Sequence, residues 1–180
     1  MYSNAENSLG FTLMELLVTV AIVGILTSMA APSFSTFVQD RKHKASLNDF
    51  RNALAYTRSE AVKRGLPTVI CASSNGSNCN GSTWSDGWLV FVDENGNDNK
   101  DSAEEQLQLG AGLDSGYSLI GTADVDTKIR YQPDGDSVTT GAITLCDPRG
   151  VSEAKALIIT PSGRARESNA GLGGTPLICS

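Results

Sequence analysis

The chain has 180 residues, which is long enough for one compact domain and a membrane segment but too short for two large domains with a membrane span. Its formal net charge is -6 and its isoelectric point lies near 4.7. This excludes a protein whose whole surface binds nucleic acid, because phosphate binding needs accumulated lysine and arginine.

The first predicted element is an apolar segment, residues 11–31, in which Glu15 is the one ionisable side chain. A helix of about 20 residues crosses a hydrocarbon core of about 30 Å, so this segment can span a membrane. A secretory signal peptide is the main alternative, but residues 1–10 contain no lysine or arginine. A carboxylate at mid-membrane costs about 2.5–3.5 kcal/mol, so Glu15 should have a positive partner. Cleavage between Gly10 and Phe11 would supply one, the new α-amino group on each neighbouring copy.

The stretch GFTLMELLVTVAIVGILTSMAAPSF, residues 10–34, resembles the signal and first helix of type IV pilins and type II secretion pseudopilins. The resemblance implies that residues 1–10 are a prepilin leader, that a prepilin peptidase cuts after Gly10, and that Phe11 is N-methylated. It also implies that Glu15 docks on the N-terminus of a neighbour during assembly. Gly24 and Pro32 stand where pilins place residues that soften the helix.

Beyond Pro32, which should kink the helix rather than end it, a second half follows over residues 32–64. Its apolar positions form the stripe of an amphipathic helix: Leu47, Phe50, Leu54, Thr57 and Ala61. Gly65 is the expected C-cap, with Pro67 just beyond it.

Residues 65–180 read as a β-rich head. The β-branched and aromatic runs TVIC, GWLVFVD, YSLI, KIRYQ, AITLC and ALIIT are separated by turn residues and predict antiparallel strands. The expected class is α+β and pilin-like, with one long helix packed on a sheet or sandwich. Four stretches resemble the GspH/FimT/FimU group of minor pilins and pseudopilins: SDGWLVFVDENGNDNKDSAEEQL, YQPDGD, LCDPRG and LIITPSGR.

Four cysteines form an even set, which in an exported chain favours two disulfides in an oxidising compartment. Three pairings are open. We expect Cys71 to pair with Cys79, closing a short polar loop, and Cys146 to pair with Cys179, tying the tail to the domain. A zinc site is disfavoured, because there is no CxxC spacing and the single histidine lies in the predicted helix.

Two features of the sequence, a basic cluster and the cysteines, predict opposite sides of the membrane for the head. The basic cluster RKHK, residues 41–44, would place the head in the cytoplasm by the positive-inside rule, whereas the cysteines favour the periplasm. We give the cysteines more weight and expect a single-pass protein of the inner membrane with a periplasmic head. Once assembled in a pilus, the head would be extracellular.

One loop has the spacing of a calcium site. Oxygen-bearing side chains occupy alternate positions of an EF-hand-like pattern: Asp93, Asn95, Asn97, Asn99, Asp101 and Glu104. However, Asp98 stands where the sharp turn of an EF-hand needs glycine, and the preceding residues predict a strand instead of a helix. We therefore favour a plain polar hairpin loop over a metal site.

The C-terminal tail is locally basic, with Arg149, Lys155, Arg164 and Arg166 against two acidic residues. Arginines two apart on an extended segment point the same way and suit phosphate oxygens. The sequence GRAR resembles the tail motif of FimT-like pilins that take part in DNA uptake, with Arg164 and Arg166 matching its arginines. The alternative is that these arginines pair with nearby glutamates or face a neighbouring minor pilin.

No nucleophile motif and no phosphate-binding glycine loop after a strand is present in the sequence, so we expect no enzyme activity and no cofactor. The expected function is that of a minor type IV pilin, assembled by its N-terminal helix into the pilus or its tip complex. The alternatives are a DNA-binding pilin for natural transformation and a type II secretion pseudopilin. The resemblance implies as partners other major and minor pilins, the prepilin peptidase, the inner membrane and the pilus assembly machinery.

Overall fold

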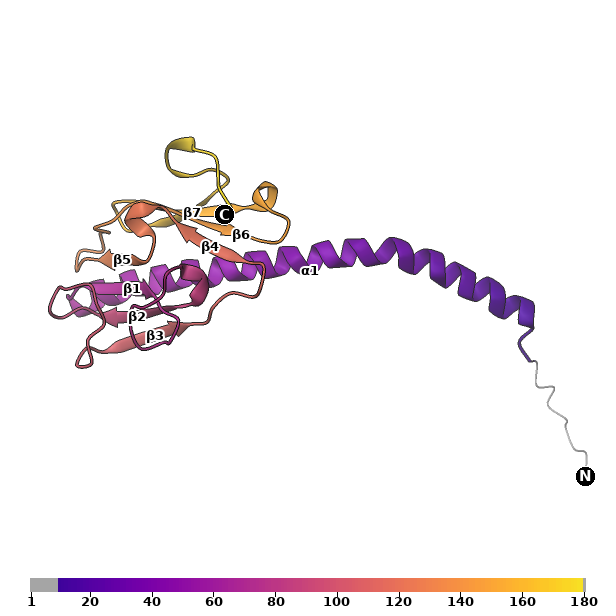
Figure 1. The fold of residues 1–180 in the computed structure, drawn as a ribbon, viewed down its shortest axis with the longest axis horizontal. Helices are drawn as coiled ribbons and strands as arrows, with labels where there is room; N and C mark the ends of the chain where they lie inside the picture. Colours follow the sequence, from indigo (N-terminus) through magenta and orange to yellow (C-terminus); the bar gives the residue numbers. More distant parts are fainter. Residues whose placement is uncertain (1–9, 180) are drawn as a thin grey trace, which may run out of the picture. The chain divides into compact units, whose positions relative to one another are not determined.

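The structure is a computed structural model that describes residues 10–179, the side chains of residues 29–33 excepted. The chain forms two compact units, residues 1–41 and 42–180 (Figure 1). From the sequence, the head is expected to begin at residue 65. The compact unit begins earlier because the second part of the long helix supplies a face of its core.

Helix α1 (Leu13–Arg64) runs for 52 residues. It passes through position 32 without ending, while the side chain of Pro32 lies outside the described residues. The helix ends as predicted at Gly65, whose φ of 65° is in the left-handed region that glycine adopts without strain. The N–H of Gly65 donates to the carbonyl of Ala61 at 3.0 Å, which closes the last turn.

The predicted helical stripe is confirmed, because all five of its residues are buried. Phe50 is 0% exposed and meets the rings of Trp84 and Trp88 edge-on, with centroid distances of 5.0 and 5.1 Å. Such edge-to-face pairs contribute about 0.5–1.5 kcal/mol beyond the burial of their area. This aromatic cluster joins the helix to the strands of the head.

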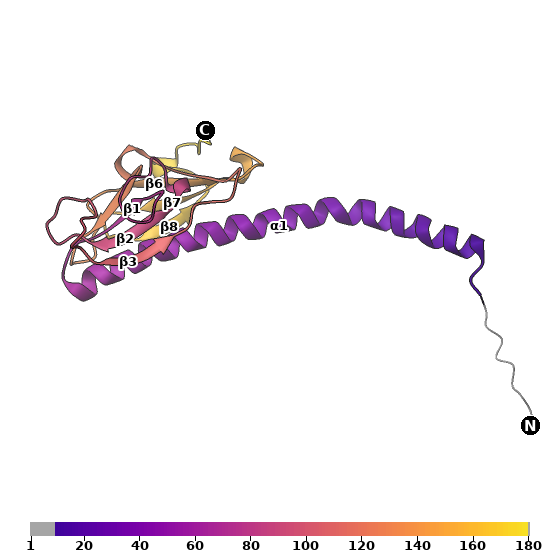
Figure 2. The ribbon, with the colours of Figure 1, turned by 60° about the horizontal axis from the view of Figure 1, so that its bottom comes forward.

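Two four-stranded antiparallel sheets make up the rest of the head (Figures 1 and 2). The first has the order β3-β2-β1-β5 and comprises β1 (Thr68–Ala72), β2 (Trp88–Val92), β3 (Gln106–Gly110) and β5 (Lys128–Tyr131). The second has the order β4-β6-β7-β8 and comprises β4 (Ser118–Gly121), β6 (Gly141–Cys146), β7 (Lys155–Ile159) and β8 (Ala165–Ser168). The connecting segments of the described residues contain three short 3-10 helices, η1 (Trp84–Asp86), η2 (Ala123–Val125) and η3 (Val151–Glu153), and a fourth, η4 (Leu172–Gly174), follows β8.

The main core lies between the two sheets and the helix. It contains residues of α1, such as Leu54, together with Ile70 of β1 and Leu157 of β7. The other face of β1 and β2 is buried as well, because Val69 and Cys71 of β1 and their neighbours Leu89 and Phe91 of β2 are all 0% exposed. Burial on both faces explains why β1 and β2 read as continuous apolar runs. The predicted α+β class, with a long helix on a β-rich head, is confirmed.

Two strands, β3 and β8, were not predicted. Both lie at the edge of a sheet and are only partly buried: QLQLG alternates glutamine with leucine, and ARES is mostly polar. Edge strands commonly carry polar side chains, because one side of the strand and often one face meet water. Neither sequence therefore contains the apolar, β-branched run by which the other strands were predicted.

Candidate functional site

The first candidate site lies at the start of helix α1. Gly10 and Phe11 precede the helix, and Thr12 caps it: the backbone N–H of Glu15 donates to Oγ1 of Thr12 at 3.2 Å. Thr12 and Glu15 have the spacing of a capping box, and an acid in the first turn is favoured by the helix dipole. The return bond from the carboxylate is not formed. The carboxylate of Glu15 therefore has no partner within residues 10–179.

The following turns present an apolar surface that the chain itself does not cover. Every large apolar side chain from Phe11 to Leu26 is exposed, and Phe11 is 81% exposed. Nothing lies within 4 Å of the position that a Cβ on Gly24 would occupy, so the surface is open there too. Such a surface needs cover from lipid or from other protein.

The sequence analysis predicted a membrane span over residues 11–31. Within the described part of the chain, no helix is both long and apolar enough to cross a membrane. The side chains of residues 29–33 lie outside that part.

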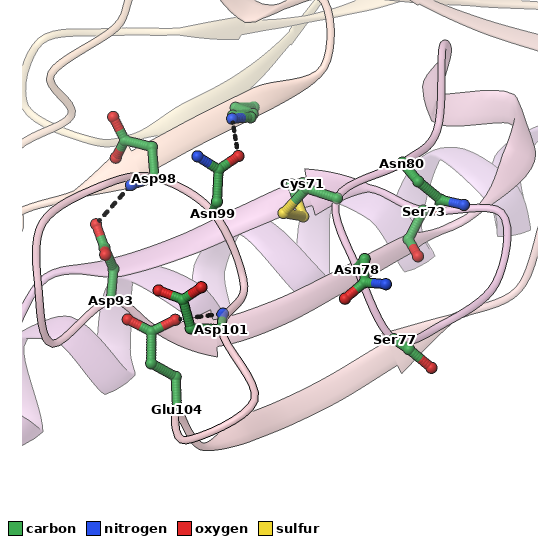
Figure 3. Close-up of a disulfide and its surroundings, with 12 residues drawn as sticks. Cys71, Ser73, Ser77, Asn78, Asn80, Asp93, Asp98, Asn99, Asp101 and Glu104 are labelled. Carbon is green, nitrogen blue, oxygen red and sulfur yellow. Dashed lines mark hydrogen bonds between the residues drawn. A yellow bond between two sulfur atoms is a disulfide. The ribbon is translucent and has the colours of Figure 1, made fainter.

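The four cysteines form the two expected disulfides. Cys71 on β1 pairs with Cys79, which closes a polar loop (Figure 3). Cys146 at the end of β6 pairs with Cys179, 33 residues later, and so holds the C-terminal tail to the second sheet. No free cysteine occurs in the described residues. Each disulfide therefore restrains a segment that has little core of its own.

The loop after β2 is organised around Asp93, which is fully buried. Its carboxylate accepts hydrogen bonds from the backbone N–H groups of Gly96, Asn97 and Asp98 at 3.0–3.2 Å (Figure 3). Arg130 of β5 lies 3.2 Å from Asp93 and 2.8 Å from Asp98. The positive charge beside the carboxylates of Asp93 and Asp98 is therefore supplied by the guanidinium group of Arg130.

The far end of this loop is held in the same way. Glu104 accepts hydrogen bonds from the backbone N–H groups of Glu94 at 3.0 Å and Asp101 at 2.9 Å, while the amides of Asn95 and Asn97 donate to Asp101. Among the described residues, no group of three or more acidic, histidine or cysteine side chains could hold a metal ion. The carboxylates of Asp93 and Glu104 are thus directed at backbone N–H groups of their own loop.

The basic residues of the tail divide into two pairs. Arg149 is bound by Asp147, with 2.6 Å between Nη2 and Oδ2, and Lys155 donates to the side chain of Asn169 at 2.5 Å. Burial acts to raise the pKa of Asp147, but the hydrogen bonds from Arg149 overcome it and hold that pKa below its usual value. Both members of this first pair are therefore already engaged within the head.

Arg164 and Arg166 form the second pair, and their surroundings differ. Both are exposed, at the start of β8 and on the strand itself, and neither makes an ion pair or a side-chain hydrogen bond within the described chain. Ala165 between them packs against the main core, so the two arginines point away from it. The suggested pairing with nearby glutamates is not observed.

One charge cluster joins the end of helix α1 to the start of β3. Arg64 binds the buried Glu60 through Nε at 2.6 Å and Glu105 through its two terminal nitrogens at 2.6 and 3.1 Å. The hydrogen bond from Arg64 holds the pKa of Glu60 below its ordinary value of 4.5, although burial opposes it. The pKa of Glu105 is lowered first by the same guanidinium.

This cluster predicts a pH dependence of stability. A carboxyl group with a lowered pKa in the folded state contributes stability above its unfolded pKa and loses it as the pH falls through the folded pKa. We expect Glu60→Gln to lower the melting temperature at pH 7 and to flatten its decline between about pH 5 and pH 3. Thermal unfolding across that range checks this, with the exposed Glu94→Gln as the control. A Glu60→Gln profile parallel to that of the native protein would contradict the prediction.

Comparison with known proteins places this fold. The family model of type II transport protein GspH matches residues 46–163, well over half of the chain. The chain belongs to the GspH family. A second model, the prokaryotic N-terminal methylation motif, matches residues 7–31 of this GspH-family chain. The resemblance predicted from GFTLMELL and from the motifs of the head is thereby confirmed.

Two curated relatives of the GspH-family chain come from Thermus thermophilus. The type IV narrow pilus major component PilA5 is 34% identical over 79 residues, which are 42% of this chain and 67% of the relative. The pilin-like protein PilA1 is 26% identical over 165 residues, which are 88% of this chain and 90% of the relative. Both relatives are named as pilins or pilin-like proteins.

Solved structures share the fold. The type IV minor pilin FimU of Pseudomonas aeruginosa aligns with a TM-score of 0.59 at 18% identity, over 73% of this chain and 92% of FimU. The minor pseudopilin EpsH from the type II secretion system of Vibrio cholerae aligns with a TM-score of 0.50 at 12% identity, over 71% of this chain and 96% of EpsH. At these identities the likeness is one of fold.

Sequence reasoning missed two features of the site. Thr12 was not recognised as the cap of helix α1, although the TLME spacing of a capping box was available as a signal. The engagement of Arg149 by Asp147 was also missed, because the two residues face each other only in the turn after β6.

Proposed function

We propose that this GspH-family protein is a minor type IV pilin that assembles into a pilus or its tip complex through helix α1. The observation that supports this most directly is the carboxylate of Glu15, which has no partner in the described residues and lies on a helix whose apolar side chains are exposed. A charge in such a surface is costly unless a neighbour neutralises it. Leader cleavage after Gly10 would place an amine at Phe11 for that purpose.

Assembly follows from the same surface. In the membrane, residues 11–31 are covered by lipid, and in the filament they are covered by the equivalent helices of other subunits. Each Glu15 then meets the N-terminal amine of an adjacent subunit, and this pairing sets how far one helix is displaced along the next. Gly24 and Pro32 allow the helix to adapt to its neighbours.

The partners in this proposal are other major and minor pilins, the prepilin peptidase, the inner membrane and the assembly machinery. The head is periplasmic before assembly and extracellular in the pilus. The proposed role is structural and needs no cofactor and no catalytic turnover.

Deleting the gene distinguishes a minor pilin of the type IV pilus from a pseudopilin of the type II secretion system. A minor pilin predicts fewer surface pili and reduced twitching with protein secretion intact, whereas a pseudopilin predicts lost secretion with pili intact. The fold of EpsH and the description of the GspH family are the observations that support the pseudopilin alternative.

Mass spectrometry of the mature protein should find Phe11, N-methylated, as its first residue. A mature chain that begins at Met1 would contradict both functions.

A second function, DNA binding for natural transformation, is favoured by the two exposed arginines that have no partner in the described chain, Arg164 and Arg166. Two guanidinium groups make few phosphate contacts, so we expect weak, salt-sensitive binding that is indifferent to sequence. Several copies in one filament would raise the avidity.

The arginine pair gives a direct prediction. The double variant Arg164→Gln and Arg166→Gln should abolish the shift of duplex DNA in a gel at low salt, while Arg149→Gln with Lys155→Gln should leave most of it. The reason is that the first pair has free guanidinium groups and the second pair is engaged by Asp147 and Asn169. Absence of a shift by the native protein at low salt would remove the DNA function and leave the structural one.

A further inference from the structure

A groove of about 490 Å³ lies along the open edge of the first sheet, between helix α1 and strand β3. One wall carries polar side chains of the helix, and the other is β3 with the loop that follows it. The lining residues used below are Asp49, Trp88, Gln108, Gly110 and Asp114. The groove lies wholly within the compact unit of residues 42–180.

Strand β3 is the outer strand of its sheet and pairs with β2 on one side only. Along the other side, its backbone N–H and C=O groups have no strand partner in the described residues. Gln108 and Leu109 are exposed at this edge. An open strand edge of this kind is a template for a further strand, and proteins that bind extended peptides use it in that way.

The floor of the groove is shaped by a glycine. In the register of the sheet Gly110 lies opposite Trp88, and a Cβ at position 110 would come within 1.9 Å of the indole ring. The absence of a side chain lets the indole lie flat beneath the strand edge. The groove therefore combines an apolar floor with polar walls.

The charged side chains that line the groove indicate what kind of segment could bind there. Asp114 is already paired with Lys42 at 2.9 Å. Asp49 is exposed on the helical wall and has no hydrogen bond or ion pair within the described part of the molecule. The charge left unpaired is therefore negative, which disfavours nucleic acid and favours a basic side chain.

We propose that strand β3 accepts an extended segment of a neighbouring pilus subunit as a fifth strand of its sheet, with an arginine or lysine of that segment entering the groove beside Asp49. This inference rests on the proposed function, because it needs neighbouring subunits. Main-chain hydrogen bonds to β3 supply affinity, and the charge-assisted pair with Asp49 selects the segment.

The test uses the full chain in a piliated bacterium, with the photoreactive residue p-benzoyl-phenylalanine at position 108. Irradiation should yield an adduct that tandem mass spectrometry maps to a segment of a pilus subunit, a second copy included, that contains arginine or lysine. In the Asp49→Asn background the adduct should fall by about tenfold, because the amide keeps an acceptor oxygen but loses the charge that strengthens the pair. The matched control, Asp124→Asn on η2, removes an exposed carboxylate outside the groove and should leave the yield unchanged.

Three outcomes would overturn the inference: no adduct above the level seen with the photoreactive residue at position 124, an adduct whose yield ignores Asp49→Asn, or an adduct with lipid, DNA or a segment without a basic residue. The amount of the position-108 variant in sheared pili is measured in the same cells. If the position-108 variant is found in sheared pili but gives no adduct, only this inference is overturned. If the native protein itself is absent from sheared pili, the proposed function is overturned.

Discussion

Replacing Glu15 by glutamine is expected to lower the amount of the protein in sheared pili by about tenfold or more, since a hydrogen-bonded pair with a charged group contributes about 1.5–3 kcal/mol. The neutral side chain would enter the membrane more easily than the acid, so poor insertion cannot explain a loss. Glutamine also serves at this position of a capping box, so the helix start formed with Thr12 is preserved. The remaining effect reports on pairing between subunits.

Immunoblots of sheared pili and of the membrane fraction make this measurement. The conservative variant Glu15→Asp keeps the charge and should retain part of the incorporation. The membrane level of Glu15→Gln should equal that of the native protein. If Glu15→Gln enters pili at the native level, the assembly role assigned to the carboxylate is wrong.

The second large effect concerns the core of the head. Phe50→Ala should destabilise the protein by about 3–5 kcal/mol, because a fully buried aromatic ring is removed and the surrounding structure refills the space only in part. Phe50 is 0% exposed and holds Trp84 and Trp88 by edge-on contacts, so their fluorescence reports directly on its loss. These are the two tryptophans of the chain.

Denaturant unfolding of the detergent-solubilised protein, followed by tryptophan fluorescence, checks this value. The matched control is Phe34→Ala on the same helix, where the ring is 69% exposed and the expected change stays within about 0.5 kcal/mol. Equal destabilisation by the two variants would mean that Phe50 does not hold the helix to the sheets.

The predictions from sequence succeeded where the signal is local. The five-residue stripe from Leu47 to Ala61 follows from helical periodicity alone, and the helix end at Gly65 follows from the backbone freedom of glycine. Six strands were found because their apolar, β-branched runs are buried. The expected disulfide partners are the observed ones: Cys79 lies in a short loop beside Cys71, and this pairing leaves Cys146 for Cys179.

The failures concern residues whose role depends on a partner distant in the chain. The edge strands β3 and β8 have no apolar run of their own and form only because β2 and β7 present free backbone groups beside them. Asp98 has a φ of 59°, in the left-handed region that usually favours glycine, in a loop held by Asp93 and by Arg130 from another strand. Neither arrangement can be read from local composition.

The long helix, its acid at position 15, the α+β class and the family follow from the sequence alone, because periodicity, a charge within an apolar run and motif spacing act over a few neighbouring residues. Three features emerge only from the tertiary structure: the order of the strands, the partners of the tail arginines among the described residues, and the groove that Asp49 lines beside β3. The physical reason is that strand pairing and ion pairing join residues far apart in the chain, and their partners are chosen by packing of the whole head.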